Sequence, residues 1–113
     1  MTADSVEERR GRLDRGDAAG QAVVAFGGDV ILGQSQNALT ARDGPTRALG
    51  GVPELAEADL AIVNLEGVVA NTGAPVAKGS GRQPFQFRGR PELLAVLAAA
   101  GIDVVATANN HSG

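Results

Sequence analysis

The sequence predicts an α/β fold built from parallel βαβ units, and two observations lead to this class. Short apolar runs with the composition of buried strands occupy residues 21–26, 60–64 and 102–108. Helix-forming stretches separate them, most clearly between the second run and the third. Alternating strands and helices are typical of parallel sheets with right-handed crossovers, and a length of 113 residues fits one domain.

The folded domain is expected to span residues 22–113. Residues 1–21 are rich in charge and poor in large apolar side chains, so they predict a disordered tail or a frayed helix. The run QAVVAF, at Gln21–Phe26, predicts the first strand. The glycine pair at 27–28 then predicts a tight turn that ends this strand, with Asp29 on the turn.

A helix over about residues 53–58 and a strand at Leu60–Asn64 are predicted next. Pro53 suits the first position of the helix, and a Gly-Gly break precedes it. LAIVN is a continuous apolar run that ends in polar residues, and Glu66 stands two residues after its last position. The second predicted strand therefore also ends beside a carboxylate.

A basic stretch and a helix lead to the third predicted strand. Residues 68–90 contain no Asp or Glu and predict a basic loop, in which PFQFR could form a hairpin; its cationic residues are Lys78, Arg82, Arg88 and Arg90. PELLAVLAAAG predicts a helix with Pro91 at its first position and Gly101 at its C-terminal cap. IDVVATA then predicts a strand that runs directly into NNH.

Composition excludes several classes of function. The net charge of -3 and the pI near 5.0 give no general attraction to nucleic acid or to anionic membrane surfaces. The absence of cysteine excludes disulfides and thiolate metal sites. The first residues lack the apolar segment of a secretory signal, and no run is long enough to span a bilayer. We therefore expect a soluble protein, cytoplasmic by default.

Polar residues follow each predicted strand at the point where it ends. Because ligands of open α/β sheets collect at the carboxyl ends of parallel strands, these residues are candidates for one site: Asp29, Asn64, Glu66, Asn109, Asn110 and His111. Carboxylates, amides and an imidazole suit Mn²⁺, Fe²⁺, Zn²⁺ or Mg²⁺. Alternatively, each Asp or Asn is a turn residue that bonds its local backbone, and the histidine is solvated. Three successive strand ends of this kind favour a shared site.

Two other features allow competing interpretations. GGDVILG fits neither of the glycine-rich phosphate-loop patterns, so we interpret its glycines as a turn. Arg82 and Arg88 are candidates for binding an anionic substrate, such as a polyglutamate or a phosphate, although basic loops are commonly just solvated. Phe85 and Phe87 alternate with polar residues and predict an anchor between this loop and the core.

The strand-end motifs resemble a known family. GGDVILG, ADLAIVNLEGVV and PFQFRGRPELLAVLAAAGIDVVATANNH are similar, in order and spacing, to the N-terminal part of the CapA/PgsA family of capsule and poly-γ-glutamate synthesis proteins. The resemblance covers about residues 22–113. Members of that family have the fold of the calcineurin-like metallophosphoesterases. The resemblance therefore implies the N-terminal half of a metallophosphoesterase-like α/β sandwich.

The resemblance also implies a role for the residues that match its motifs. Asp29 is similar to the metal ligand on the first strand of the family, and Glu66 to the carboxylate shared between two metals. Asn110 is similar to the amide ligand of the second metal. His111 is similar to the histidine that stabilises or protonates the leaving group.

Two further consequences follow from the resemblance. Asn64 and Asn109 are implied to orient their neighbours through hydrogen bonds. Members of the family usually continue with further strands and later histidines, which this chain lacks. The metal site is therefore expected to be incomplete, so that the fragment need not retain its metal, and an apolar edge and face of the sheet are expected to be uncovered.

The function implied by the resemblance is that of a divalent-metal-dependent phosphoesterase or related hydrolase in capsule or poly-γ-glutamate biosynthesis, completed by a missing C-terminal half. Its implied partners are an anionic polymer, polyglutamate or polysaccharide, or the export machinery, and not nucleic acid. Two alternatives stay open: a non-catalytic binding or assembly subunit for polymer synthesis or export, and an inactive truncated reading frame.

Overall fold

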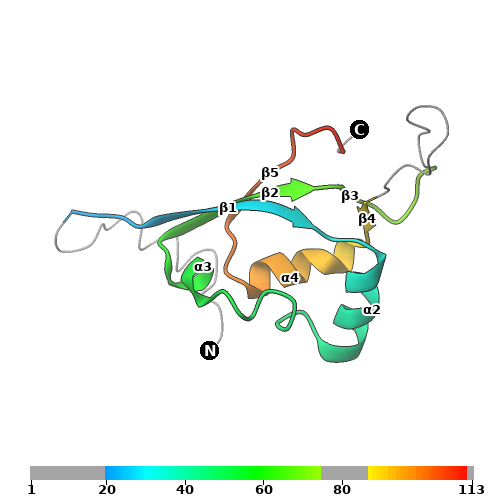
Figure 1. Cartoon of the computed structure of the whole chain (residues 1–113), viewed down its shortest axis with the longest axis horizontal. Helices are drawn as coiled ribbons and strands as arrows, with labels where there is room; N and C mark the ends of the chain where they lie inside the picture. Colours follow the sequence, from blue (N-terminus) through cyan, green and yellow to red (C-terminus); the bar gives the residue numbers. More distant parts are fainter. Residues whose placement is uncertain (1–19, 75–86, 112–113) are drawn as a thin grey trace.

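The computed structural model describes residues 20–74 and 87–111, and its centre is a three-stranded parallel sheet. The strands are β1 (Val24–Ile31), β2 (Leu60–Glu66) and β5 (Val104–Ala106), in the order β1-β2-β5 (Figure 1). Helices occur in the connections between them, which confirms the predicted α/β fold of parallel βαβ units. The predicted tail up to residue 19, Arg82 and most of PFQFR lie outside the described residues.

The helical segments of the described ranges are α2 (Gln34–Asp43), α3 (Pro53–Glu57), the 3₁₀ turn η1 (Pro91–Leu93) and α4 (Leu94–Ala99). α3 and the η1–α4 segment confirm the two predicted helices, and each begins with its proline. α2 has no counterpart among the predicted helices, because QSQNALTARD has no apolar stripe at helical spacing. None of these described helices is both long and apolar enough to cross a membrane.

α4 ends at the glycine that the sequence predicts as its cap. Gly101 has a φ of 80°, in the left-handed region that favours glycine. The Ile102 amide donates to the Leu97 carbonyl at 3.1 Å, and the Gly101 amide donates to the Ala98 carbonyl at 3.1 Å. These two bonds form a Schellman motif, which satisfies the last carbonyls of the helix and turns the chain toward β5.

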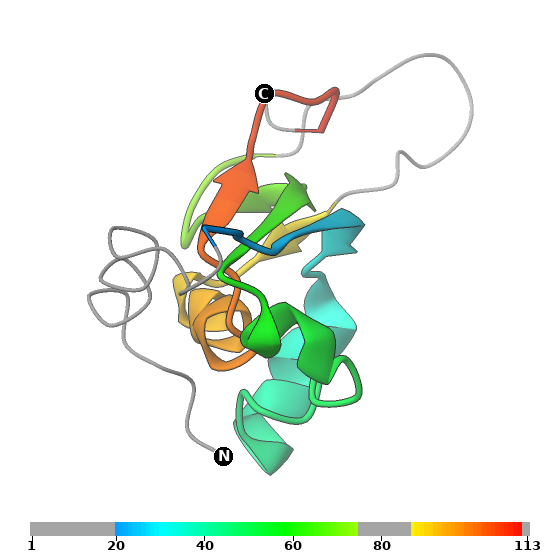
Figure 2. The same ribbon diagram turned by 90° about the vertical axis from the view of Figure 1, so that its left-hand side faces the viewer.

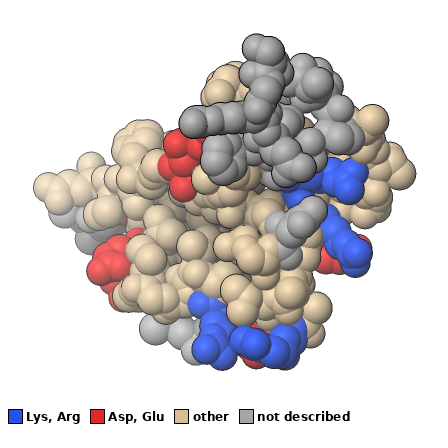
Figure 3. All heavy atoms as spheres, turned by 45° about the vertical axis from the view of Figure 1, so that its right-hand side comes forward, with Lys and Arg blue, Asp and Glu red and all other residues tan. Residues whose placement is uncertain are grey.

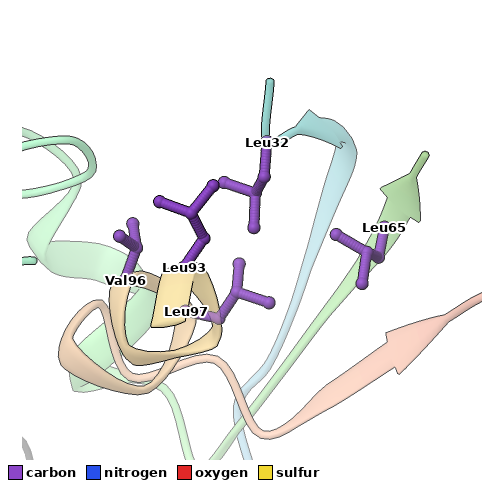
Figure 4. Close-up of a cluster of buried hydrophobic side chains, with 5 residues drawn as sticks. All are labelled: Leu32, Leu65, Leu93, Val96 and Leu97. Carbon is purple, nitrogen blue, oxygen red and sulfur yellow. The ribbon is translucent and has the colours of Figure 1, made fainter. Parts of the chain in front are cut away.

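The hydrophobic core lies between the sheet and the helices, which all cover the same face of the sheet (Figures 1 and 2). Alternate residues of β2 point into this core, since Ala61, Val63 and Leu65 are buried and their neighbours are only half-buried. The principal cluster consists of Leu32, Leu65, Leu93, Val96 and Leu97. Figure 4 shows the leucines of the η1–α4 segment lying toward Leu32, just after β1, and toward Leu65 in β2.

The opposite face of the sheet is apolar and exposed. On that face, Phe26 of β1 pairs in register with Ile62 of β2, and Ile62 pairs with Val104 of β5. Phe26 is 78% exposed and Val104 is 44% exposed. This face therefore carries exposed apolar side chains on both outer strands of the sheet.

β1 does not end where the sequence predicts. The strand continues through the glycine pair to Ile31, so Asp29 lies within it and not on a turn. The register pairs Phe26 with Ile62 and Asp29 with Asn64, which leaves both glycines opposite the single residue Val63. This shift absorbs the extra residue as a bulge does, and it keeps Asp29 and Asn64 on the same face of the sheet. The predicted tight turn is therefore wrong.

Gly27→Ala is expected to destabilise the fold, whereas Gly28→Ala is expected to be nearly neutral. A Cβ at position 27 would lie 2.8 Å from Cγ1 of the buried Val63, and a Cβ at position 28 would meet nothing within 4 Å. Overpacking of this kind costs about 1–3 kcal/mol. Urea unfolding measures the free energy of unfolding of both variants. Equal losses of stability would contradict the close approach of position 27 to Val63 as the reason for the difference.

Two short strands form a second, separate parallel pair where the sequence predicts a basic loop that could contain a hairpin at PFQFR. They are β3 (Val68–Val69) and β4 (Arg88–Gly89). The Val68 amide donates to the Phe87 carbonyl at 2.8 Å, and the Ala70 amide donates to the Gly89 carbonyl at 3.1 Å. Strands of two residues are too short to produce an alternating pattern, which is why the loop prediction is wrong here. The pair places Phe87 and Arg88 directly beside the end of β2.

Candidate functional site

The polar residues predicted to gather at the strand ends do so for the most part. Parallel pairing places Asp29 of β1 beside Asn64 of β2, and Glu66 lies at the last position of β2. Asn109 and His111 reach the same edge from the turn after β5. We call these five residues the strand-end cluster. The remaining candidate, Asn110, lies between the last two in sequence and is exposed to solvent.

Two asparagines connect the strands through their side-chain amides. Asn64 Nδ2 donates to Asp29 Oδ1 at 2.7 Å. Asn109 Nδ2 donates to the Leu65 carbonyl at 2.9 Å and to Asn64 Oδ1 at 3.3 Å. A continuous row of hydrogen bonds therefore runs from the turn after β5 across β2 to the carboxylate on β1.

His111 is held by three different contacts. Its backbone amide donates to Asn109 Oδ1 at 2.9 Å, and its Nε2 lies 3.2 Å from Glu66 Oε1. The ring of Phe87 packs edge-on against the imidazole, with centroids 4.9 Å apart and an interplanar angle of 63°. His111 is thus half-buried and held in one orientation. The alternative interpretation, in which this histidine is simply solvated, does not fit these contacts.

The carboxyls of Asp29 and Glu66 shift each other's pKa in opposite directions. Hydrogen bonds from Asn64 and then from Glu66 hold the pKa of Asp29 below its ordinary value. The pKa of Glu66 is raised, first by the hydrogen bond with Asp29, then by burial and the Asp29 charge, while His111 acts in the opposite direction. Of the two carboxyls, Asp29 therefore favours the ionised form and Glu66 favours the protonated form.

Asp29→Asn is expected to lower the pKa of Glu66 toward its ordinary value, because the variant removes the carboxylate that accepts a hydrogen bond from protonated Glu66 and also removes its charge. In the unmodified chain, protonated Glu66 stabilises the fold below the ordinary pKa, and this contribution is lost as the pH rises through the raised pKa. Ionised Asp29 stabilises the fold above its ordinary pKa, and this contribution is lost as the pH falls through the lowered pKa.

Carboxyl ¹³C chemical shifts measured by NMR across the acidic range check this expectation. Asp43→Asn is the matched control, because Asp43 pairs with Arg42 and Arg47 and not with the strand-end cluster. A pKa of Glu66 that stays raised in Asp29→Asn would contradict the assignment of Asp29 as its main cause.

The strand-end cluster contains the kinds of side chain that bind divalent cations, but the described residues supply too few of them for a complete site. Carboxylate and amide oxygens with an imidazole are the donors that Mn²⁺, Fe²⁺, Zn²⁺ or Mg²⁺ bind in proteins. Within residues 20–74 and 87–111, however, no three or more His, Cys, Asp or Glu side chains are grouped so as to hold a metal ion. Within the described residues, the two carboxylates Asp29 and Glu66 therefore do not form a complete metal site by themselves.

The sequence does not indicate that Phe87 belongs to the cluster, and it indicates Arg88 only as a candidate for binding an anionic substrate. The sequence predicts that Phe87 anchors the loop to the core. In the structure, its ring contacts the imidazole of His111. Arg88 is exposed on β4, where its Nη1 donates to the Gly73 carbonyl at 2.9 Å. An isolated aromatic residue in a glycine-rich stretch gives no signal of which distant side chain it contacts.

Comparison with known proteins agrees with the strand-end motifs. The model of a family described as bacterial capsule synthesis protein PGA_cap matches residues 23–113. No curated protein and no solved structure matches the chain. The family match covers most of the sequence, including both β1 and the turn that carries Asn109 and His111. The chain belongs to the PGA_cap family of bacterial capsule synthesis proteins.

Proposed function

We propose that the chain acts in capsule synthesis as the part of a divalent-metal-dependent, phosphoesterase-like hydrolase that carries the strand-end cluster. The observation that carries the proposal is the geometry of two carboxylates at this edge: Asn64 Nδ2 donates to Asp29 Oδ1 at 2.7 Å, and His111 Nε2 lies 3.2 Å from Glu66 Oε1. The pair lies at the carboxyl edge of a parallel sheet, where α/β proteins bind their ligands. The partner we propose is an anionic polymer, a polyglutamate or a polysaccharide.

The carboxyl pair supports a cation as the missing component. Repulsion between two neighbouring carboxylates disfavours the ionisation of both, and a bound cation would relieve that repulsion. Asp29 and Glu66 would hold the cation, with the exposed amide of Asn110 as a further ligand from the turn after β5. When bound, such a cation supplies Lewis-acid polarisation of a phosphoryl oxygen.

The remaining residues of the cluster are proposed to position groups around that cation. Asn64 holds one oxygen of Asp29, which fixes the direction of its other oxygen. Asn109 fastens the backbone of His111 to β2. His111, packed against Phe87 and bonded to Glu66, is placed to protonate the oxygen of a leaving group.

Calorimetric titration of the full chain with Mn²⁺, followed by an assay of p-nitrophenyl phosphate hydrolysis, tests the proposal. Because the described residues supply too few ligands for a closed site, we expect weak Mn²⁺ binding and slow hydrolysis that stops when a chelator is added. Tight binding of two ions that survives Asp29→Ala and Glu66→Ala would overturn the assignment of these residues. A complete absence of Mn²⁺ binding would overturn the metal-dependent function.

A further inference from the structure

A groove separate from the strand-end cluster lies between α2 and the β3–β4 pair. It encloses about 520 Å³ and opens to solvent. Its polar lining consists of Asn37 on α2, Asn71 after β3, and Arg88 and Arg90 on and after β4. Small side chains, among them Ala38 and Ala41, line the rest. We call this feature the arginine groove.

Backbone contacts hold the walls of the arginine groove in place. The Arg90 amide donates to Asn37 Oδ1 at 3.3 Å, which ties the end of β4 to α2. Gly89 is buried between them, and a Cβ there would lie 2.7 Å from the Leu32 carbonyl oxygen and 3.0 Å from Leu93 Cδ1. The close approach that glycine permits thus joins the groove to the hydrophobic core, and the alanines of α2 leave the space above it open.

The positive charge in the arginine groove is not neutralised within the described part of the chain. Arg88 and Arg90 are exposed, and neither forms an ion pair with a described carboxylate, including that of nearby Glu92. Arg88 instead donates to the Gly73 carbonyl at 2.9 Å, which orients the guanidinium and leaves its charge unpaired. Figure 3 shows the described basic side chains gathered in separate patches.

The other described arginines, Arg42 and Arg47, both form ion pairs with a carboxylate, unlike the two arginines of the groove. Arg42 Nη2 lies 2.7 Å from Asp43 Oδ2, and Arg47 Nη1 lies 3.1 Å from the same oxygen. Their charges are therefore shared with a carboxylate on the same surface. In a chain of net charge -3, two arginines that line one groove and form no ion pair with a described carboxylate are the feature that favours an anion.

We propose that the arginine groove binds an oxyanion, a carboxylate or a phosphate, carried by an extended ligand. Guanidinium groups bind both kinds of anion through paired N–H donors, and side-chain amides such as that of Asn71 add further donors. A groove of about 520 Å³ has room for several atoms beyond a single anion. The ligand class is thus a chain that bears repeated or terminal anionic groups.

The position of the groove makes it a subsite for the substrate of the strand-end cluster. Phe87, whose ring contacts His111, immediately precedes Arg88 in the chain. An anionic chain anchored by Arg88 and Arg90 would therefore be held beside the β3–β4 pair, next to the end of β2. This last step rests on the function proposed above, whereas oxyanion binding in the groove does not.

Titration of the full chain at low ionic strength, in buffer with EDTA, tests the proposal in two arms. One arm uses a hexaglutamate peptide and the other uses inorganic phosphate, and the NMR signals of the Asn71 side-chain amide report binding in the groove. Binding of the peptide alone identifies carboxylates as the ligand, and binding of phosphate alone identifies phosphate groups. If neither perturbs Asn71, the proposal is wrong.

Variants separate the groove from general electrostatics. Arg88→Gln combined with Arg90→Gln is expected to weaken binding by at least about tenfold. Arg47→Gln removes a comparable exposed charge and is expected to change the affinity by less than about twofold. Equal losses in the two proteins would overturn the proposal. Asn71→Ala, which changes no charge, provides a second test should the double variant fold poorly. Its binding is followed by the backbone amide signals of Ala70 and Gly89, which also line the groove, and an unchanged affinity would count equally against the groove.

Asp29→Ala distinguishes failure of this proposal from failure of the proposed function. The variant alters the strand-end cluster and leaves the lining of the arginine groove intact. Oxyanion binding is therefore expected to persist in it, whether or not the unmodified chain binds Mn²⁺. Loss of oxyanion binding in Asp29→Ala with EDTA present would contradict an independent site.

Discussion

Leu93→Ala is expected to destabilise the protein by about 2–5 kcal/mol, because it removes most of a buried side chain from the centre of the core. Leu93 is 1% exposed and belongs to the cluster that joins the η1–α4 segment to Leu32 and Leu65 (Figure 4). Small domains are stable by only about 5–15 kcal/mol. The buried hydrophobic residues of the described chain are all Leu, Val or Ala, so the core has no large aromatic side chain to compensate.

Leu94→Ala is the matched control for this substitution. Leu94 is the next residue in the chain and is 46% exposed, and its replacement by alanine removes the same atoms as in Leu93→Ala. Its replacement is expected to cost well under half as much as that of Leu93, since exposed leucine loses little contact when truncated. Urea unfolding followed by circular dichroism measures both. Similar losses would mean that the η1–α4 segment packs on the sheet by a different face.

The sequence predicts elements whose stability depends on local chemistry. The strands β2 and β5 are continuous apolar runs, and the η1–α4 segment has proline at its start and glycine at its cap. These signals act within a few residues, so they can be recognised without knowing the fold. α2 lacks such a signal. It depends on tertiary contacts, such as the bond from the Arg90 amide to Asn37, which no local pattern indicates.

The end of β1 shows how a correct local signal can lead to a wrong boundary. Two consecutive glycines usually end a strand, so the sequence predicts that β1 ends at the glycine pair 27–28. In the structure, both glycines lie opposite Val63 and the strand continues on the other side of them. Whether glycines end a strand or shift its register depends on the neighbouring strand, whose alignment is a long-range property.

The members of the strand-end cluster were predictable because parallel strands bring their carboxyl ends to one edge. That rule gathers Asp29, Asn64, Glu66, Asn109 and His111 without any knowledge of distances. The rule could not predict which side chains bond to one another or that Phe87 packs on His111. Those contacts depend on side-chain orientation and on a β3–β4 pair that the sequence does not reveal.

Asp29→Ala and Glu66→Gln are each expected to lower the affinity for Mn²⁺ by about 100-fold or more, because each removes one of the two carboxylates proposed as ligands. Asn64→Ala is expected to have a smaller effect, about tenfold, since it only frees the Asp29 carboxylate that Asn64 Nδ2 holds at 2.7 Å. Glu57→Gln, at an exposed position in α3, removes a carboxylate far from the site in the sheet and is expected to change nothing.

Paramagnetic broadening of NMR signals by substoichiometric Mn²⁺ measures this series even when binding is weak. In the unmodified chain, the signals of Asp29, Glu66 and His111 are expected to broaden first. Because each variant removes one of the two proposed carboxylate ligands, broadening should disappear in both variants alike. Broadening that persists in Asp29→Ala and Glu66→Gln while disappearing in Glu57→Gln would place the cation elsewhere, and the strand-end cluster would then be a purely structural network between β1, β2 and β5.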